Sequence, residues 1–201
     1  MIGIIDCGVG NIKSFHFFYT ENNTNIKIVK SVSEISHDID KIILVGVSSF
    51  DTMMKALDKN DFPNFLNKFV KNQNNKLLGI CCGMQVLGIS SEEGNLKGLG
   101  LLNGKNYLLK NKIKPHLGWN NLSMIKKNSQ ILSNIDEKDF FYFLHSYHLE
   151  IDDEDTHVSY SQYESYNVAS VVAKNNIYGV QFHPEKSHNA GKKILLNFKN
   201  L

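Results

Sequence analysis

Short apolar runs spaced by longer amphipathic stretches constrain the fold of the first half of the chain more than any other feature. Each run has the length of a strand buried on both faces, and together they cover residues 2–5, 26–29, 42–45 and 77–80. Between the last two runs, apolar residues recur at helical spacing over residues 50–70. Strands that alternate with helices predict crossover connections and a largely parallel sheet.

The second half of the chain has a different rhythm. Further strands, joined by short turns, are predicted at residues 107–109, 140–144, 168–172 and 177–182. Ile194, Leu195 and Phe198 share one side of a last helix. No repeat or linker divides the chain, and 201 residues can bury roughly 70% of their unfolded surface in one core. The sequence therefore predicts a single α/β domain over residues 1–201.

Composition argues against several classes of function. All 22 basic residues are lysines and the net charge is +2, so neither nucleic acid nor a membrane is indicated as a partner. Three cysteines are too few for a disulfide framework or a zinc site. The N-terminal segment lacks the flanks of a signal peptide, and no apolar run approaches the ~20 residues that span a bilayer. We expect a soluble protein of the reducing cytoplasm.

Cys81 is the candidate nucleophile. It lies between Gly79 and Gly83, where an apolar strand runs into a helical stretch. Small residues at this spacing are typical of a strand–nucleophile–helix elbow, because the tight turn crowds the flanking backbone. A helix end and a nearby imidazolium would both favour the thiolate. Taken alone, the segment is also compatible with a buried structural pair formed by Cys81 and Cys82, and Cys7 is assigned to the core.

His183 is the candidate base. It ends the apolar stretch 177–182, and Pro184 and Glu185 follow it. Ligands of open parallel sheets collect beyond the carboxyl ends of the strands, where Cys81 would also lie. A carboxylate two residues after a histidine can bond its second ring nitrogen, although such a turn alone can also be a capping loop. The other histidines considered are interpreted as a packing position (His16) or as solvated residues (His37, His148 and His157).

At these residues the sequence resembles the class I glutamine amidotransferases, and most closely the glutaminase subunits of imidazole glycerol phosphate synthase. The match runs the full length of the chain. It comprises IDCGVGN at 5–11, Gly46, Val47 and Phe50, GICCGMQ at 79–85, SEE at 91–93, GLGL at 98–101, PHLGWN at 115–120, HSY at 145–147 and GVQFHPEKS at 179–187. The resemblance implies a three-layer, flavodoxin-like α/β fold around a central mixed, mostly parallel sheet.

The resemblance also implies a role for each matching residue. Cys81 would be the nucleophile, His183 the base and Glu185 its orienter, and the amides of Val47 and Cys82 would form the oxyanion hole. The glutamine pocket would be formed by Gly46, Gln85, Glu93, His145, Ser146 and Tyr147. The residues facing a (β/α)8-barrel synthase that receives the ammonia would be Asn11, Trp119, Tyr142 and Lys186. No metal or cofactor is implied.

Three of the partner-facing positions have simpler interpretations. Trp119 could belong to the core, Asn11 could cap a helix, and Lys186 could be a solvated charge. The sequence also departs from the family pattern at two places. Val45 and Ser48 stand where the family usually has proline and glycine, which changes the backbone freedom of the oxyanion loop. Cys82 stands where an apolar residue is common.

The main hypothesis is an ammonia donor for imidazole glycerol phosphate formation in histidine biosynthesis, and two alternatives to it remain, of which the first is motivated by these departures. One is a paralogous glutaminase that serves another synthase, such as one that amidinates a surface sugar. The other is a non-catalytic subunit of the same complex, although no reacting residue is missing. A cysteine peptidase fits the pocket residues less well. A dinucleotide-binding domain is rejected because Lys13 occupies the position of the third small residue of its fingerprint.

Overall fold

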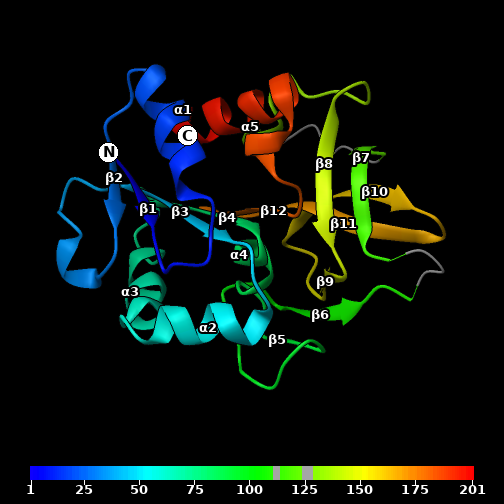
Figure 1. Cartoon of the computed structure of the whole chain (residues 1–201), viewed down its shortest axis with the longest axis horizontal. Helices are drawn as coiled ribbons and strands as arrows, with labels where there is room; N and C mark the ends of the chain where they lie inside the picture. The colour runs from blue at the N-terminus through cyan, green and yellow to red at the C-terminus, as the bar shows by residue number, and fades with distance from the viewer. Residues whose placement is uncertain (111–113, 124–128) are drawn as a thin grey trace.

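The computed structural model describes residues 1–110, 114–123 and 129–201. Its centre is a seven-stranded sheet in the order β10-β11-β12-β4-β3-β1-β2 (Figure 1). Its strands are β1 (Ile2–Ile5), β2 (Ile26–Val29), β3 (Lys41–Gly46), β4 (Lys76–Cys81), β10 (His157–Tyr163), β11 (Tyr166–Lys174) and β12 (Ile177–Val180). The five strands from β12 to β2 are parallel, and β10 and β11 add an antiparallel edge.

Helices cover both faces of this sheet and make three layers. Helices α1 (Ile12–Glu21) and α5 (His188–Asn200) lie on one face, and α2 (Phe50–Asp58) and α3 (Phe62–Phe69) lie on the other (Figure 1). Neighbouring residues of a buried strand therefore enter different cores. Ile4 packs in the cluster that contains Phe15 and Phe198, whereas Ile5 packs in the cluster that contains Met53. This alternation explains why the strands read as continuous apolar runs.

Two small sheets lie beside the carboxyl edge of the central sheet. One is formed by β5 (Ser90–Ser91), β6 (Gly104–Leu108) and β9 (Tyr147–Ile151), and the other by β7 (His116–Asn121) and β8 (Phe140–His145). The β7–β8 pair has a buried side, with His116, Phe141, Phe143 and His145. Its opposite side exposes Leu117, Trp119, Phe140 and Leu144. Single-turn or 3₁₀ segments complete the fold: η1 (Val32–Glu34), α4 (Cys82–Gln85), η2 (Gln130–Leu132) and η3 (Pro184–Lys186).

The predicted elements of the first half are confirmed, whereas the second half was predicted less completely. The strand predicted over residues 177–182 ends at Val180. Strand β7 was not predicted because glycine, tryptophan and asparagine interrupt its apolar pattern. The acidic run 152–155 lies between β9 and β10, as expected for a turn.

Two residues are placed differently from the prediction. His148 is 3% exposed, not solvated, because it lies on β9 opposite Tyr107 and its ring is covered by the ring of Tyr166. Cys7 is half-buried at the margin of a core cluster and not inside it.

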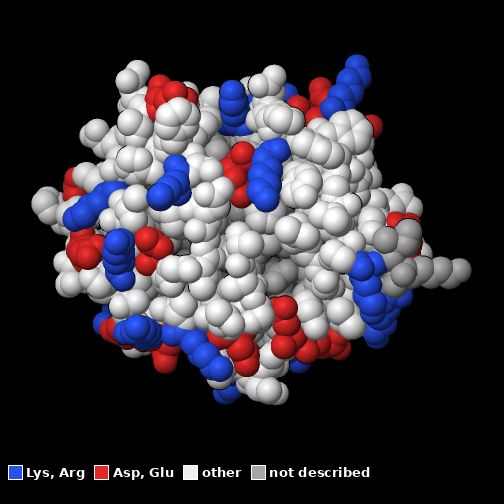
Figure 2. All heavy atoms as spheres, in the orientation of Figure 1, with Lys and Arg blue, Asp and Glu red and all other residues white. Residues whose placement is uncertain are grey.

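The surface and the helices bear on the expected partners. On the face drawn in Figure 2, lysine and acidic side chains are interspersed around the edge and the centre is largely uncharged. A face that binds nucleic acid would concentrate one sign of charge, and this face does not. In the described ranges, no helix combines the length and apolar character needed to cross a bilayer.

Candidate active site

Cys81 occupies a sharp turn between β4 and α4. Its φ of 55° is positive, a backbone conformation that residues other than glycine adopt rarely and at a cost in conformational energy. The two flanking glycines make this turn possible. A Cβ on Gly79 would lie 2.5 Å from the carbonyl oxygen of Gly83, and a Cβ on Gly83 would lie 1.9 Å from that of Leu44. The elbow therefore has the expected geometry, but the helix after it is a single turn, so its dipole contributes little.

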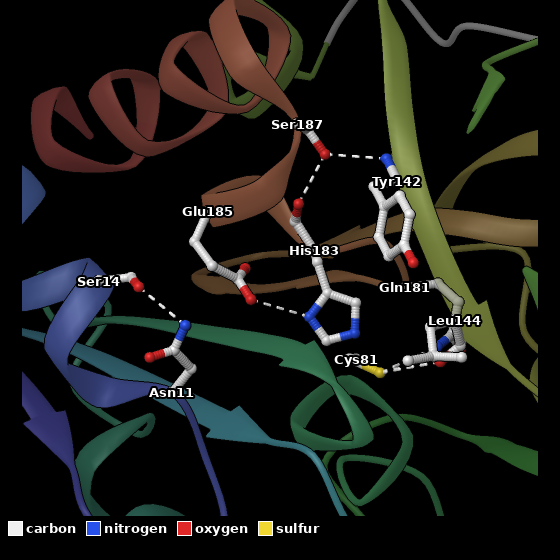
Figure 3. Close-up of polar contacts among 9 residues, drawn as sticks. All are labelled: Asn11, Ser14, Cys81, Tyr142, Leu144, Gln181, His183, Glu185 and Ser187. Atoms are coloured by element: carbon white, nitrogen blue, oxygen red, sulfur yellow. Dashed lines mark hydrogen bonds and ion pairs between the residues drawn. The ribbon is translucent and has the colours of Figure 1, made fainter. Parts of the chain in front are cut away.

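His183 lies beside Cys81 in the loop that follows β12 (Figure 3). Its Nδ1 is 3.0 Å from Oε1 of Glu185, and both side chains are almost completely buried. Among the described residues, Nε2 of His183 has no hydrogen bond of regular geometry. A histidine held through Nδ1, with Nε2 directed at a thiol, has the arrangement needed to exchange a proton with the sulfur.

The environment of His183 favours its protonated form. Burial alone would lower its pKa, but the close thiol of Cys81 and the carboxylate of Glu185 together outweigh burial and raise the pKa to about 10. An imidazolium at this position would stabilise a thiolate on Cys81.

Ser187 braces the His183 loop against β8. Its hydroxyl donates to the carbonyl oxygen of His183 at 2.6 Å and accepts from the amide of Tyr142 at 3.0 Å (Figure 3). The amide of His183 in turn donates to the carbonyl of Tyr142 at 2.8 Å. The position of the candidate base therefore depends on the β7–β8 sheet as well as on the central sheet.

A cavity of about 270 Å³ opens next to Cys81 and is sized for a small ligand. It is lined by Val47, Ser48, Cys81, Cys82, Gln85, Glu93, Pro115, Leu144, His145, Ser146 and Tyr147. The tertiary structure thus brings five of the six predicted pocket residues to one cavity. Gly46, the sixth, is not among these lining residues, and a Cβ on it would meet the amide nitrogen of Gly83 at 2.8 Å.

The wall beside His145 is fixed by a chain of hydrogen bonds between two buried imidazoles. Nδ1 of His145 faces the carbonyl oxygen of Tyr147 at 2.9 Å, so this nitrogen must carry the proton. Nε2 of His145 then accepts from Nδ1 of His116 at 3.0 Å. Nε2 of His116 is left as an acceptor for the side-chain amide of Asn120 at 3.3 Å. Both histidines are therefore neutral, and neither can take up a proton without breaking a bond.

We expect this pair to make the protein sensitive to acid. Burial lowers the pKa of His116 to about 4, and burial together with the neighbouring His116 lowers that of His145 to about 3. Below the unfolded value of about 6.5, the unfolded chain binds more protons than the folded one. The free energy of unfolding should then fall by on the order of 1.4 kcal/mol per pH unit and per histidine between pH 6.5 and 4.

Urea unfolding at a series of pH values measures this slope. A His116→Leu variant should have a shallower slope than the wild-type chain because one titrating group is gone. His157→Gln, at an exposed histidine, should keep the wild-type slope. Equal slopes in all three proteins would contradict the assignment.

The candidate oxyanion loop is held in a closed arrangement. The amide of Val47 donates to the carbonyl oxygen of Val9 at 2.6 Å, so it is not directed at the cavity. On the other side of the loop, Gly46 lies close to the side chain of Cys82. The second predicted donor, the amide of Cys82, belongs to the first residue of α4. An oxyanion hole needs two amide N–H groups directed at one oxygen. To provide one of them, the Val47 amide would have to give up its hydrogen bond to the carbonyl oxygen of Val9.

The predicted partner-facing residues lie at the surface, and several contact one another. Trp119 is 48% exposed, so it is not a core residue, and its ring meets the edge of Tyr142 at 5.8 Å and stacks on His188 at 5.0 Å. Lys186 lies over the ring of Tyr142 at 5.4 Å. Asn11 is at the N-cap position of α1, but its amide donates to Ser14 and makes no side-chain cap.

Sequence reasoning missed three polar residues that support the site: His116, Gln181 and Ser187. Gln181 donates to Cys81 Sγ at 3.8 Å and accepts from Gln85 at 3.0 Å. A polar residue inside the apolar stretch 177–182 was the available signal, since a buried amide needs partners.

Comparison with known proteins gives a consistent result. The fold is an α/β fold with a three-layer architecture, and the carboxyl ends of its parallel strands bring together a cysteine, a histidine and a glutamate. The model of the family "Glutamine amidotransferase class-I" matches residues 3–200. Among solved structures, PurLQS of Thermotoga maritima superimposes with a TM-score of 0.77 at 19% identity, over 99% of this chain and 97% of that one. At this identity, the likeness shows the fold alone.

Relatives closer in sequence identify a narrower family. The chain is 40% identical to the imidazole glycerol phosphate synthase subunit HisH of Leptospira interrogans, over all of both chains. It is 43% identical to HisH 2 of Methanococcus maripaludis, over 98% of each. The chain therefore belongs to the class I glutamine amidotransferases, and among them to the HisH family.

Proposed function

We propose that this protein hydrolyses glutamine to glutamate and ammonia, and that it supplies the ammonia to a synthase subunit that forms imidazole glycerol phosphate in histidine biosynthesis. The observation that carries the proposal is the buried Nε2 of His183, which has no regular hydrogen bond among the described residues and faces Cys81 while Glu185 holds Nδ1. Membership of the HisH family supports the choice of pathway.

In the proposed reaction, Nε2 of His183 transfers a proton in each of the two halves. The thiolate of Cys81 attacks the side-chain carbonyl carbon of glutamine, and His183 protonates the nitrogen that leaves as ammonia. A thioester with Cys81 remains. His183 then takes a proton from water, the resulting hydroxide attacks the thioester, and the proton returns to the sulfur as glutamate departs.

The cavity suits the proposed substrate. Glu93 brings a carboxylate to its wall, and Oε2 of Glu93 is fixed by the backbone amide of Phe50 at 2.7 Å. A fixed carboxylate would pair with the α-ammonium group of glutamine. Gln85 uses its side-chain nitrogen on Tyr147 and Gln181, so only its Oε1 remains for a ligand. An acceptor at this position selects a substrate that presents N–H groups.

We further propose that the partner is a (β/α)8-barrel subunit, in a cytoplasmic heterodimer, that docks on the exposed side of β7–β8. Leu117, Trp119 and Phe140 are each about half exposed on adjoining strands. Exposed apolar groups that lie together indicate a protein contact. The loop at Val47 is also exposed, and Val47 shares a cavity with Asn11 and Lys186. A docked partner could therefore release the Val47 amide from Val9 and complete the oxyanion hole.

Glutamate release by the purified chain, with and without the barrel subunit, tests the proposal. We expect little release alone and a rise when the partner and its substrate are added, because the Val47 amide is engaged at Val9. Trp119→Ala should lose the rise while Cys81 still reacts with a glutamine-analogue electrophile. No glutamate with the partner, together with no labelling of Cys81, would refute the proposal.

A further inference from the structure

Gln181 is the most deeply buried polar side chain beside the nucleophile. It is 0% exposed and follows β12, whose register with β4 pairs Val180 with Ile80. The next residue of each strand is Gln181 and Cys81, so parallel pairing carries this amide to the sulfur. Burial of an amide is unfavourable unless its groups are hydrogen-bonded. The backbone amide of Gln181 donates to the carbonyl oxygen of Ser170, so it is not the group that meets the sulfur.

Neighbouring hydrogen bonds fix which end of the Gln181 amide faces the sulfur. One atom of the Gln85 amide lies 2.7 Å from the carbonyl oxygen of Tyr147, so this atom must be a nitrogen that donates. The same nitrogen is 3.0 Å from the Gln181 amide, which must present its oxygen there. The remaining atom of the Gln181 amide is therefore the nitrogen, and it lies 3.8 Å from Sγ of Cys81.

The proton on Cys81 determines when this donor matters. In the thiol form, Sγ can donate to the carbonyl oxygen of Leu144 at 3.8 Å (Figure 3). When the proton moves to His183, the bond to Leu144 is lost and the sulfur becomes an anion. The N–H of Gln181 then donates to a charged acceptor, and such bonds are roughly twice as strong as neutral ones. The Gln181 contact thus favours the thiolate over the thiol.

We propose that Gln181 is a further residue of the active site, which stabilises the Cys81 thiolate through its Nε2 and holds Gln85 in its binding orientation through its Oε1. The inference rests on the proposed function for its consequence, because a larger thiolate fraction supplies more of the attacking species. It predicts that loss of the Gln181 donor reduces the reactivity of Cys81 even when glutamine is absent.

Several other ionisable groups surround Cys81, and the Gln181 variants described below leave all of them unchanged. His183 and Glu185 face the site from the loop after β12, and His145 faces it from β8. Glu93 lines the cavity, and Cys82 begins α4. Burial raises the pKa of Cys82 far above its usual range, so its thiol stays protonated and unreactive at neutral pH.

The test is the pH profile of Cys81 alkylation by iodoacetamide, with the modified residue located by tandem mass spectrometry. Gln181→Met removes the N–H donor with little change in size. Gln181→Glu keeps an acceptor oxygen for Gln85 but replaces the N–H donor with a second carboxylate oxygen. We expect the midpoint of the profile to rise by about one pH unit, with roughly tenfold slower alkylation at pH values below the wild-type midpoint. Gln162→Met, at an exposed residue of β10, should keep the wild-type profile.

Thermal unfolding of the same proteins separates this role from a purely structural one. A structural role would lower the unfolding midpoint and leave the pH midpoint of alkylation unchanged, and that result in both variants would overturn the proposal. Because alkylation needs neither glutamine nor a partner, the outcome is independent of the proposed glutaminase activity. Failure of that activity would appear instead as absence of glutamate release from the wild-type chain.

Discussion

Replacement of Cys81 with alanine should lower partner-stimulated glutamate release by roughly 10⁴-fold or more, as removal of a nucleophile from a triad does. In the proposed reaction this sulfur forms the thioester, and we expect no nearby group to substitute for it. Cys82 is adjacent, but it is 2% exposed and burial keeps its thiol protonated by raising its pKa. Cys81, and not Cys82, has the positive φ of the turn that places its side chain beside His183.

The measurement is single-turnover glutamate formation with a saturating partner, so that slow product release does not mask the chemical step. Cys7→Ala is the matched control because Cys7 is half-buried and lies on the loop after β1. It should retain nearly all activity. A Cys81→Ala variant with activity within tenfold of the wild-type chain would reject Cys81 as the nucleophile.

Replacement of Glu185 with glutamine should lower the rate by roughly 10² to 10⁴-fold, the range expected when the orienting acid of a triad becomes an amide. The carboxylate accepts from Nδ1 of His183 at 3.0 Å in a site where the Glu185 side chain is 3% exposed. An amide can present N–H there and stabilise the wrong tautomer. Loss of the negative charge also removes one cause of the raised pKa of His183.

The pH profile of the rate distinguishes this role from a general loss of structure. With Glu185→Gln, the pKa of His183 should fall from about 10, so the high-pH limb of the profile should move to lower pH. Glu150→Gln is the control, because Glu150 is exposed and lies beside His148. An unchanged profile with Glu185→Gln, or an equal change with Glu150→Gln, would argue against Glu185 as the orienter.

Much of the fold could be predicted from the sequence because its strands are buried on both faces. Such strands need uninterrupted apolar residues. The run at 2–5 corresponds to β1 residue for residue, and the runs at 42–45 and 77–80 lie within β3 and β4. Strands with one exposed side carry weaker patterns. The sequence of β7 alternates buried His116 with exposed Leu117 and Trp119, so it has no apolar run to detect.

The elbow at Cys81 could be predicted for a related reason. Steric crowding at the turn excludes every residue larger than glycine from positions 79 and 83. The spacing of these two glycines around Cys81 is therefore a sequence pattern that indicates the turn. Glu185 follows His183 by two residues, and this short separation makes their contact local as well. The proposed triad was therefore accessible from two short segments and the rule that parallel strands end at one edge.

The sequence by itself determined the parallel α/β arrangement, the position of the elbow and the histidine–glutamate pair, because each depends on residues close together in the chain. Only the tertiary structure decided the environment of these groups. Gln181 and Cys81 are 100 positions apart, and Val47 reaches the carbonyl of Val9. His116 and His145 become neutral because they meet inside the protein. Burial and hydrogen bonding depend on distant segments, and no local pattern of residues specifies which of them will meet.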